Sequence, residues 1–185
     1  MVYVYIKSTF DCVDRRSLWR ALRGKGVPDV VLKLLEDLCT HTGAKVHSGG
    51  KLSRRFHTSS GVRQGCILAL ALFCIAIDWI LGHLVPQKTG ITAGEHSFMD
   101  LTYADNDVIL PNEGQAASTL AAFSKAAAPF SLKVFWAKTK LQNLGYGPQS
   151  FDITITGSTV EGVEDFLYLG SKQTSDGRSL PDVLV

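Results

Sequence analysis

The longest apolar run in the chain lies between residues 66 and 85 and has the sequence CILALALFCIAIDWILGHLV. Its length is about that of a segment that spans a lipid bilayer. Asp78 interrupts the run, and no Lys or Arg at its flanks marks an orientation in a membrane. We therefore predict a fully buried core helix, with a membrane anchor formed by residues 66–85 as the alternative.

Composition indicates a globular chain of moderate size. Of its 185 residues, 45% are apolar, which can fill the core of one domain, and 19% are charged, too few for a disordered chain. The net charge of +2 permits an anionic partner without indicating one. The four cysteines are widely spaced, which argues against a disulfide framework or a zinc site. The first residues do not form a signal peptide, so we expect an intracellular protein, nuclear or cytoplasmic.

Apolar spacing predicts the order of the elements. Period-two alternation predicts a strand over residues 1–6, and helical spacing predicts helices over 16–23 and 30–41. The second helix carries Val30, Val31, Leu34, Leu35 and Leu38 at helical spacing. We expect a hairpin around Gly49-Gly50 over residues 44–57 and an Ala-rich helix over residues 113–128. Further strands are expected at residues 91–93, 98–103, 108–110, 132–135, 141–144, 151–155 and 166–169.

The strands form hairpins and the helices come in runs. This order predicts an α+β fold, an antiparallel β-sheet with helices packed on one face. No repeat or composition break marks a second domain, so we expect residues 1–185 to form a single domain.

Two short motifs carry the chemistry. Gly61-Val62-Arg63-Gln64-Gly65-Cys66 precedes the apolar helix, and its glycines allow the backbone to approach a ligand closely. The first N–H groups of the helix can bind a phosphate. Tyr103-Ala104-Asp105-Asn106 lies between apolar strands, so we expect Asp105 and Asn106 in a strand–turn–strand.

These motifs resemble those of reverse transcriptases. Residues 103–106 are similar to the Tyr-Ala-Asp-Asp turn of that family, and residues 61–66 to the Gly-Val-Arg-Gln-Gly-Cys loop of its non-LTR retrotransposon branch. Residues 9–15, 131–140 and 168–177 resemble further family segments in the same order. The resemblance implies a polymerase palm-like fold, an RNA template and a DNA primer as partners, and Mg²⁺ as the cofactor.

The resemblance also implies three metal-binding carboxylates, of which two are replaced. In the family, an Asp of the first strand and the Asp-Asp turn hold two magnesium ions for an in-line displacement. The first position falls on Tyr5, five residues before Phe10, and the last falls on Asn106. Asp105 is retained as the catalytic and metal-binding residue. We therefore expect a truncated reverse transcriptase domain without catalytic activity.

Other acidic residues are not expected to rebuild the metal site. Asp107 follows the turn, so simple strand alternation does not place its side chain. Asp11 is expected to cap the turn or the next helix, and Asp14 can cap that helix as well.

The resemblance further assigns residues that bind nucleotide and nucleic acid. Phe10, Arg63, Gln64 and Gly65 match positions that contact the incoming nucleotide or the template, and Lys138 matches one near the phosphates. Apart from the resemblance, Arg54 and Arg55 lie in a basic cluster around the predicted hairpin and are candidate contacts to a phosphate backbone. The alternative function is a palm remnant that binds nucleic acid without chemistry. No protein partner is inferred. The finger segments that precede the first motif, the thumb and the endonuclease domain are expected to be absent from residues 1–185.

Overall fold

The computed structural model describes residues 1–7, 9–63, 65–84, 90–103, 106–112, 114–145, 150–176 and 179–181. The chain divides into two compact units. The sheet unit comprises Met1–Lys7, Leu84–Ala126 and Lys133–Val185, and the helical unit comprises Ser8–His83 and Ala127–Leu132. Helices mixed with mainly antiparallel strands confirm the predicted α+β class.

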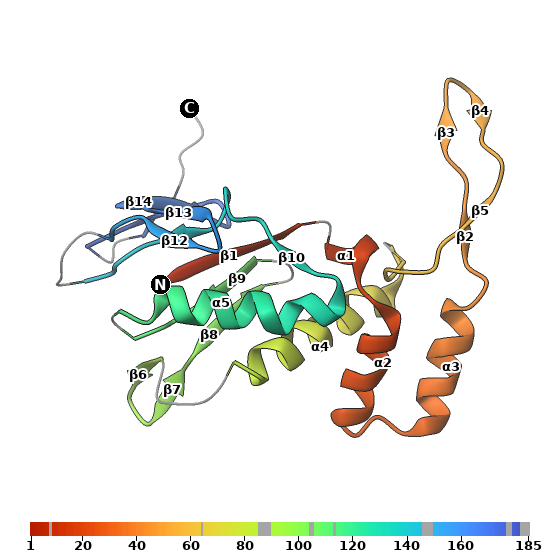
Figure 1. Ribbon diagram of the computed structural model, residues 1–185, viewed down its shortest axis with the longest axis horizontal. Coiled ribbons are helices and arrows are strands. Elements are labelled where there is room, and N and C mark those ends of the chain that lie inside the picture. Colours follow the sequence, from red (N-terminus) through yellow and green to blue (C-terminus); the bar gives the residue numbers. More distant parts are fainter. Residues whose placement is uncertain are drawn as a thin grey trace. The chain divides into compact units, whose positions relative to one another are not determined.

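A seven-stranded sheet is the main element of the sheet unit, with β1 (Val2–Lys7) at its centre (Figure 1). The strand order is β12-β13-β11-β1-β9-β8, and β10 also pairs with β1. All pairs are antiparallel except β11 with β13. The strands are β8 (Asp100–Tyr103), β9 (Asn106–Ile109), β10 (Lys133–Val134), β11 (Lys140–Leu141), β12 (Ile153–Ile155) and β13 (Ser158–Gly162).

The rest of the sheet unit consists of smaller elements. A three-stranded sheet contains β14 (Asp165–Tyr168), β15 (Ser171–Thr174) and β16 (Ser179–Pro181), and a hairpin contains β6 (Ile91–Ala93) and β7 (His96–Phe98). Helix α5 (Ala116–Ala127) belongs to the sheet unit except for its last residue, and the short helix η1 (Ala128–Phe130) that follows it belongs to the helical unit. The ring of Tyr3 in β1 packs against Phe166 and Tyr168, with ring centroids 4.5 and 5.3 Å away. This aromatic contact joins β14 to the main sheet.

The helical unit begins with α1 (Thr9–Cys12), followed by α2 (Arg15–Gly24) and α3 (Asp29–Cys39). Asp14 caps α2, because its Oδ1 accepts a hydrogen bond from the Ser17 N–H at 2.8 Å. This confirms Asp14 as a cap, whereas Asp11 lies inside α1. Helix α2 packs against α4 (Ile67–Gly82), where a Cβ on Gly24 would meet the Trp79 ring at 2.2 Å.

Helix α3 forms where its apolar spacing predicts it, but most of the spaced residues do not enter a core. Val30, Leu34 and Leu38 are 70%, 64% and 61% exposed, and Leu32 is the buried residue of this helix at 1%. Helical spacing identifies the residues that share a face, but it does not tell which face meets the rest of the unit.

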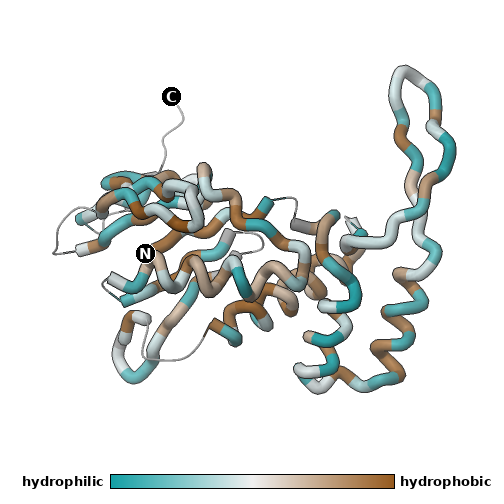
Figure 2. The backbone as a smooth tube through the Cα atoms, in the orientation of Figure 1, coloured by the Kyte–Doolittle hydropathy of each residue, from teal (hydrophilic) through white to brown (hydrophobic). Residues whose placement is uncertain are grey.

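Helix α4 corrects the expectation of a fully buried helix. One face is buried through Ala69, Leu72, Phe73, Ala76, Ile77 and Ile80. Ile67 and Leu70 are 94% and 52% exposed, and Asp78 forms a surface ion pair with Lys25 of the helical unit. Figure 2 shows the apolar character of this helix along much of its length. Within the residues that the structure describes, no helix is both long enough and apolar enough to cross a bilayer.

A β-hairpin extends from the end of α3 (Figure 1). Its base pairs β2 (Gly43–Ala44) with β5 (Phe56–His57), and its outer part pairs β3 (His47–Ser48) with β4 (Lys51–Leu52). The predicted turn at Gly49-Gly50 is confirmed, and both glycines have positive φ. We call residues 43–57 the arm.

Candidate functional site

Two of the predicted site positions are paired across adjacent strands. Tyr5 of β1 lies opposite Asn106 of β9, and Asn106 lies opposite Tyr103 of β8. The strand register therefore places side by side the two positions at which the resemblance predicts a lost carboxylate. Asp105 lies outside the described residues. The predicted strands on either side of Asp105 pair with each other as β8 and β9, and Asn106 lies in β9.

Asp107 is fully buried in β9 at 0% exposure. It lies opposite Val4 in β1 and Thr102 in β8, and so it is one residue out of register with the Tyr5–Asn106 pair. Successive side chains of a strand point to opposite faces of the sheet, which separates Asp107 from the face of Tyr5. The burial of Tyr168 raises the pKa of its phenol, and the negative charge of Asp107 raises it further.

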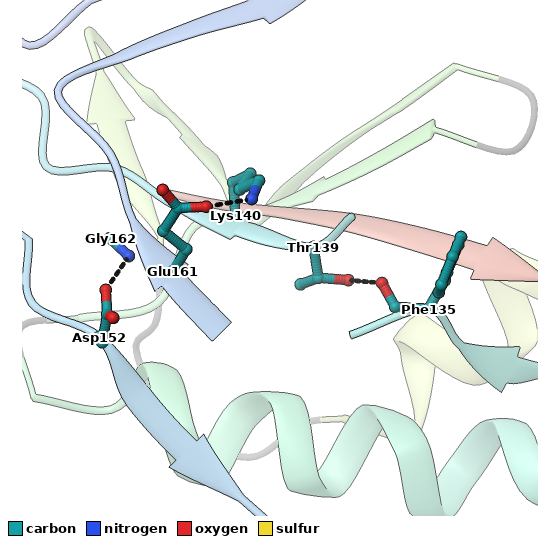
Figure 3. A network of polar contacts seen from close by, with 6 residues as sticks. All are labelled: Phe135, Thr139, Lys140, Asp152, Glu161 and Gly162. Atoms are coloured by element: carbon teal, nitrogen blue, oxygen red, sulfur yellow. Dashed lines mark hydrogen bonds and ion pairs between the residues drawn. The ribbon is translucent and has the colours of Figure 1, made fainter. Parts of the chain in front are cut away.

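The turn at residues 135–139 is attached to both backbone groups of Tyr5. The Phe135 N–H donates to the Tyr5 carbonyl at 2.7 Å, and the Tyr5 N–H donates to Oγ1 of Thr139 at 3.3 Å. The Thr139 hydroxyl in turn donates to the Phe135 carbonyl at 3.1 Å (Figure 3). Thr139 is fully buried. These contacts fix the turn that carries Lys138 beside Tyr5.

Lys138 in this turn and Lys140 in β11 have different surroundings. Lys140 forms an ion pair with Glu161 (Figure 3). Lys138 is exposed, and its Nζ lies 5.9 Å from the ring centroid of Tyr5 and 5.5 Å from that of Phe135. Of the two, Lys138 is therefore the better placed to meet a phosphate.

In the helical unit, the loop at Gly61 is held against α1. The Gly61 N–H donates to the Val13 carbonyl at 2.8 Å, and the Val62 N–H donates to the Phe10 carbonyl at 2.7 Å. Gly61 has φ +77°, and a Cβ there would lie 2.5 Å from the backbone oxygen of Asp11. Only glycine satisfies both requirements.

Arg15 is a structural residue of this loop that the sequence did not single out. Its Nε donates to the Gly61 carbonyl at 2.9 Å, and its Nη1 donates to the Cys39 carbonyl at 2.6 Å. Nη2 donates to Oγ1 of Thr42 and to the Ser60 carbonyl, both at 3.1 Å. The guanidinium thus joins the end of α3, the base of the arm and the Gly61 loop. Nothing in the sequence identified this role, because most of the acceptors are backbone carbonyls.

A surface cavity of about 590 Å³ lies beside Arg15. Its lining includes Trp19, Glu36, His41 and His57. Burial raises the pKa of the nearby Cys39 thiol, and the positive charge of Arg15 acts in the opposite direction.

Of the predicted nucleotide-binding residues in the helical unit, some are exposed to solvent and one packs in the core. The Phe10 ring packs on Phe73 of α4 with centroids 4.8 Å apart, as an ordinary core aromatic does. Arg63 and Gly65 are exposed, and Gly65 has φ +81°. Gln64 lies outside the described residues.

The arm carries exposed cations, as predicted. Lys45, Lys51, Arg54 and Arg55 are all exposed. Arg55 also has a structural contact, because its Nη2 donates to the His41 carbonyl at 3.3 Å and its Nε lies 2.5 Å from where a Cβ on Gly43 would be. Within the described residues the Arg54 side chain makes no comparable contact, so it is the more direct probe of ligand binding.

Within the described part of the chain, no group of three or more His, Cys, Asp or Glu residues is arranged to hold a metal ion. The donor set at the paired positions is a neutral phenol at Tyr5 and a neutral amide at Asn106. Two divalent cations close together require several carboxylates. These residues therefore do not fit a two-metal centre.

Known proteins are similar in sequence to this chain over most of its length. Residues 1–172 match the family described as reverse transcriptase (RNA-dependent DNA polymerase). A "Retrovirus-related Pol polyprotein from type-1 retrotransposable element R2" of Popillia japonica is 25% identical over 198 aligned residues, covering 99% of this chain and 32% of that protein. The protein of the same description from Nasonia vitripennis is 31% identical over 115 residues, covering 61% of this chain and 11% of that protein.

The chain therefore spans about a third of the length of the first of these relatives and less of the second. The match extends over all the quoted motifs up to residue 172, from the first strand through the Tyr103 turn to Tyr168. The expected resemblance to non-LTR retrotransposon reverse transcriptases is confirmed. The chain belongs to the reverse transcriptase (RNA-dependent DNA polymerase) family.

Proposed function

We propose that residues 1–185 form the palm region of a retrotransposon reverse transcriptase that no longer polymerises DNA. The pairing of Tyr5 with Asn106 carries this proposal, because it aligns the two replaced carboxylate positions on neighbouring strands. Members of the family generally use divalent metal ions, and the family's two Mg²⁺ would need charges that this pair lacks. Of the three carboxylates that the family uses, Asp105 is the one that remains.

Primer extension tests this proposal. The purified chain is incubated with an RNA template, an annealed DNA primer, deoxynucleotides and Mg²⁺. We expect no template-dependent extension, because loss of two of three metal ligands removes the charge that stabilises both ends of the displacement. Extension by the natural chain that is abolished in Asp105→Ala would refute the proposal.

A second function, binding of nucleic acid without chemistry, is supported by the arm. Four cations of the arm are exposed: Lys51 lies in β4, and Lys45, Arg54 and Arg55 lie between its two strand pairs. Apolar side chains are exposed on the same hairpin, since Val46 and Phe56 are 56% and 47% exposed. A cluster of cations on an exposed hairpin suits a phosphate backbone, which is recognised by charge rather than by base sequence.

Titration with labelled RNA and RNA–DNA duplex tests this second function. We expect binding that weakens with added salt, with a salt slope that falls by about one in Arg54→Gln. Arg20→Gln on α2 is the matched control, because Arg20 is an exposed arginine of the same unit outside the arm. Binding that is equally affected by both substitutions argues against the arm, and absence of binding to either ligand excludes this function.

A further inference from the structure

Helix α3 presents an apolar stripe that is exposed within the described part of the chain. Its members, Val30, Leu34 and Leu38, are 70%, 64% and 61% exposed, and Figure 2 shows apolar residues along this helix. Each residue turns an α-helix by about 100°, so the three side chains project within about 80° of one another. Leu32, which is 1% exposed, projects from nearly the opposite side and packs α3 onto the helical unit. Large aliphatic side chains gathered on an outer face are a feature of interaction surfaces.

Two opposite charges flank this stripe along one edge. Lys33 and Asp37 are exposed, lie about one helical turn apart and project beside Val30. Within the described residues, neither side chain forms an ion pair. A cation that lies nearer the N-terminus than its anion is the less favourable order for pairing inside one helix. These charges are therefore better placed to pair with a second helix than with each other.

A second copy of α3 in the antiparallel orientation matches the charges and the stripe in one register. A two-fold axis at the level midway between Lys33 and Asp37 places Lys33 of each copy opposite Asp37 of the other. In that register, Leu34 of one copy falls between Leu34 and Leu38 of the other, and Leu38 falls between Leu34 and Val30. The ion pairs and the interdigitated apolar side chains therefore select the same arrangement.

A parallel pair of α3 helices does not have this property. Two parallel helices related by a two-fold axis bring opposite edges of their stripes together. The edge opposite to Asp37 carries Val31, which is 40% exposed and uncharged. Asp37 would then lose water against an apolar side chain without gaining a partner.

We propose that this chain self-associates through the stripe of α3, as a two-fold dimer of antiparallel α3 helices. The helix has 11 residues and a length of about 16 Å, so its face buries less area than the ~1,600 Å² of a stable protein interface. We therefore expect a reversible dimer with a dissociation constant on the order of 10–100 µM, which is mostly monomeric at about 1 µM. The inference goes beyond the proposed function, because it concerns a face of the helical unit and none of the metal positions.

Sedimentation velocity of the full chain between about 1 and 200 µM measures this association. Leu34→Glu puts a charge at the centre of the stripe and should weaken the association by at least about ten-fold. Because the Leu34 side chain is 64% exposed, the substitution leaves the monomer folded, which an unchanged circular dichroism spectrum verifies.

Exchange of the two charges tests the antiparallel register. Lys33→Glu places like charges opposite each other at both symmetry-related sites, and so does Asp37→Lys, so each variant should associate about ten-fold more weakly than the natural chain. An equimolar mixture of the two variants should recover the natural affinity within about three-fold, because both pairs of the mixed dimer are again of opposite charge. Lys125→Glu is the control, since it makes the same charge change at an exposed position of α5 and should leave the association unchanged.

Each other outcome overturns the inference. A natural chain that stays monomeric at about 200 µM shows that a second copy does not cover the stripe, which leaves this face to another protein segment. Association that is unchanged in Leu34→Glu places the dimer contact on a different surface. Charge variants that stay monomeric after mixing exclude the antiparallel register.

Discussion

The Nε of Arg15 donates a hydrogen bond to the carbonyl oxygen of Gly61 at 2.9 Å, which joins the start of α2 to the loop of the family motif. The same guanidinium binds the Cys39 carbonyl at the end of α3 and Oγ1 of Thr42 at the base of the arm. One side chain thus organises three segments that are distant in sequence.

Replacement of Arg15 is expected to destabilise the helical unit. Arg15→Met leaves several carbonyl acceptors without their charged donor, which should lower the free energy of unfolding by about 2–4 kcal/mol. Urea unfolding followed by circular dichroism measures the change. Arg16→Met is the control, since Arg16 is an exposed neighbour on the same helix and should change stability by about 0.5 kcal/mol or less. Equal effects of the two substitutions would show that the Arg15 contacts are energetically unimportant.

The Tyr3 hydroxyl is expected to make the sheet unit sensitive to alkaline pH. Tyr3 is 2% exposed and donates to Oε1 of the buried Gln142 at 2.7 Å. Burial, with a smaller effect of Tyr168, raises the pKa of Tyr3 to about 12. Because the folded state holds this proton more tightly, the contribution of Tyr3 is complete below pH 10 and is lost as the pH rises toward 12.

Comparison with Tyr3→Phe isolates this effect from the titration of other groups. The free energy of unfolding of both proteins is measured at pH 8, 10 and 11.5. The natural chain should be more stable at pH 8 by about 1–2 kcal/mol, because the variant leaves the Gln142 amide oxygen without its donor. That difference should shrink above pH 10. A difference that stays constant across the range would contradict the pKa shift of Tyr3.

Truncation of two leucines that lie two residues apart in α3 should lower the stability by very different amounts. Leu32 is 1% exposed, and Leu32→Ala should lower the free energy of unfolding by about 2–5 kcal/mol through the cavity it leaves. Leu34 is 64% exposed, and Leu34→Ala should cost about 0.5 kcal/mol or less. Thermal or urea unfolding of both variants decides the orientation of α3. A larger loss for Leu34 would mean that its face is covered.

Local patterns in the sequence predicted where helices and strands form, but they did not predict which neighbours pack against each element. Alternation identified β1, and the Asp14 cap and apolar spacing identified α2. The strands β13 and β15 were missed because Ser158–Gly162 and Ser171–Thr174 are largely polar and lack a dense β-branched pattern. The orientation of α3 was not predictable because spacing alone does not specify what lies beside a helix.

The candidate site was predicted in its positions but not in its connections. Counting along the first motif identified Tyr5, and strand pairing confirms that it adjoins Asn106. The role of Arg15 was not predicted, because most of its acceptors are backbone carbonyls, whose positions cannot be read from the sequence. Lys138 was predicted as a phosphate contact, but its approach to Tyr5 depends on the turn that Thr139 holds.

Mn²⁺ titration tests most directly the claim that the replaced carboxylates have removed the two-metal centre. Free Mn²⁺ is measured by electron paramagnetic resonance for the natural chain and for Tyr5→Asp/Asn106→Asp. Thr154→Asp/Ser97→Asp is the control, because it adds two carboxylates at exposed strand positions elsewhere in the sheet unit. We expect the natural chain and the control to bind at most one Mn²⁺, with a dissociation constant on the order of 1 mM or weaker, and the restored variant to bind at least about ten-fold more tightly. Two Mn²⁺ ions bound tightly by the natural chain, and lost in Asp105→Ala, would contradict the account.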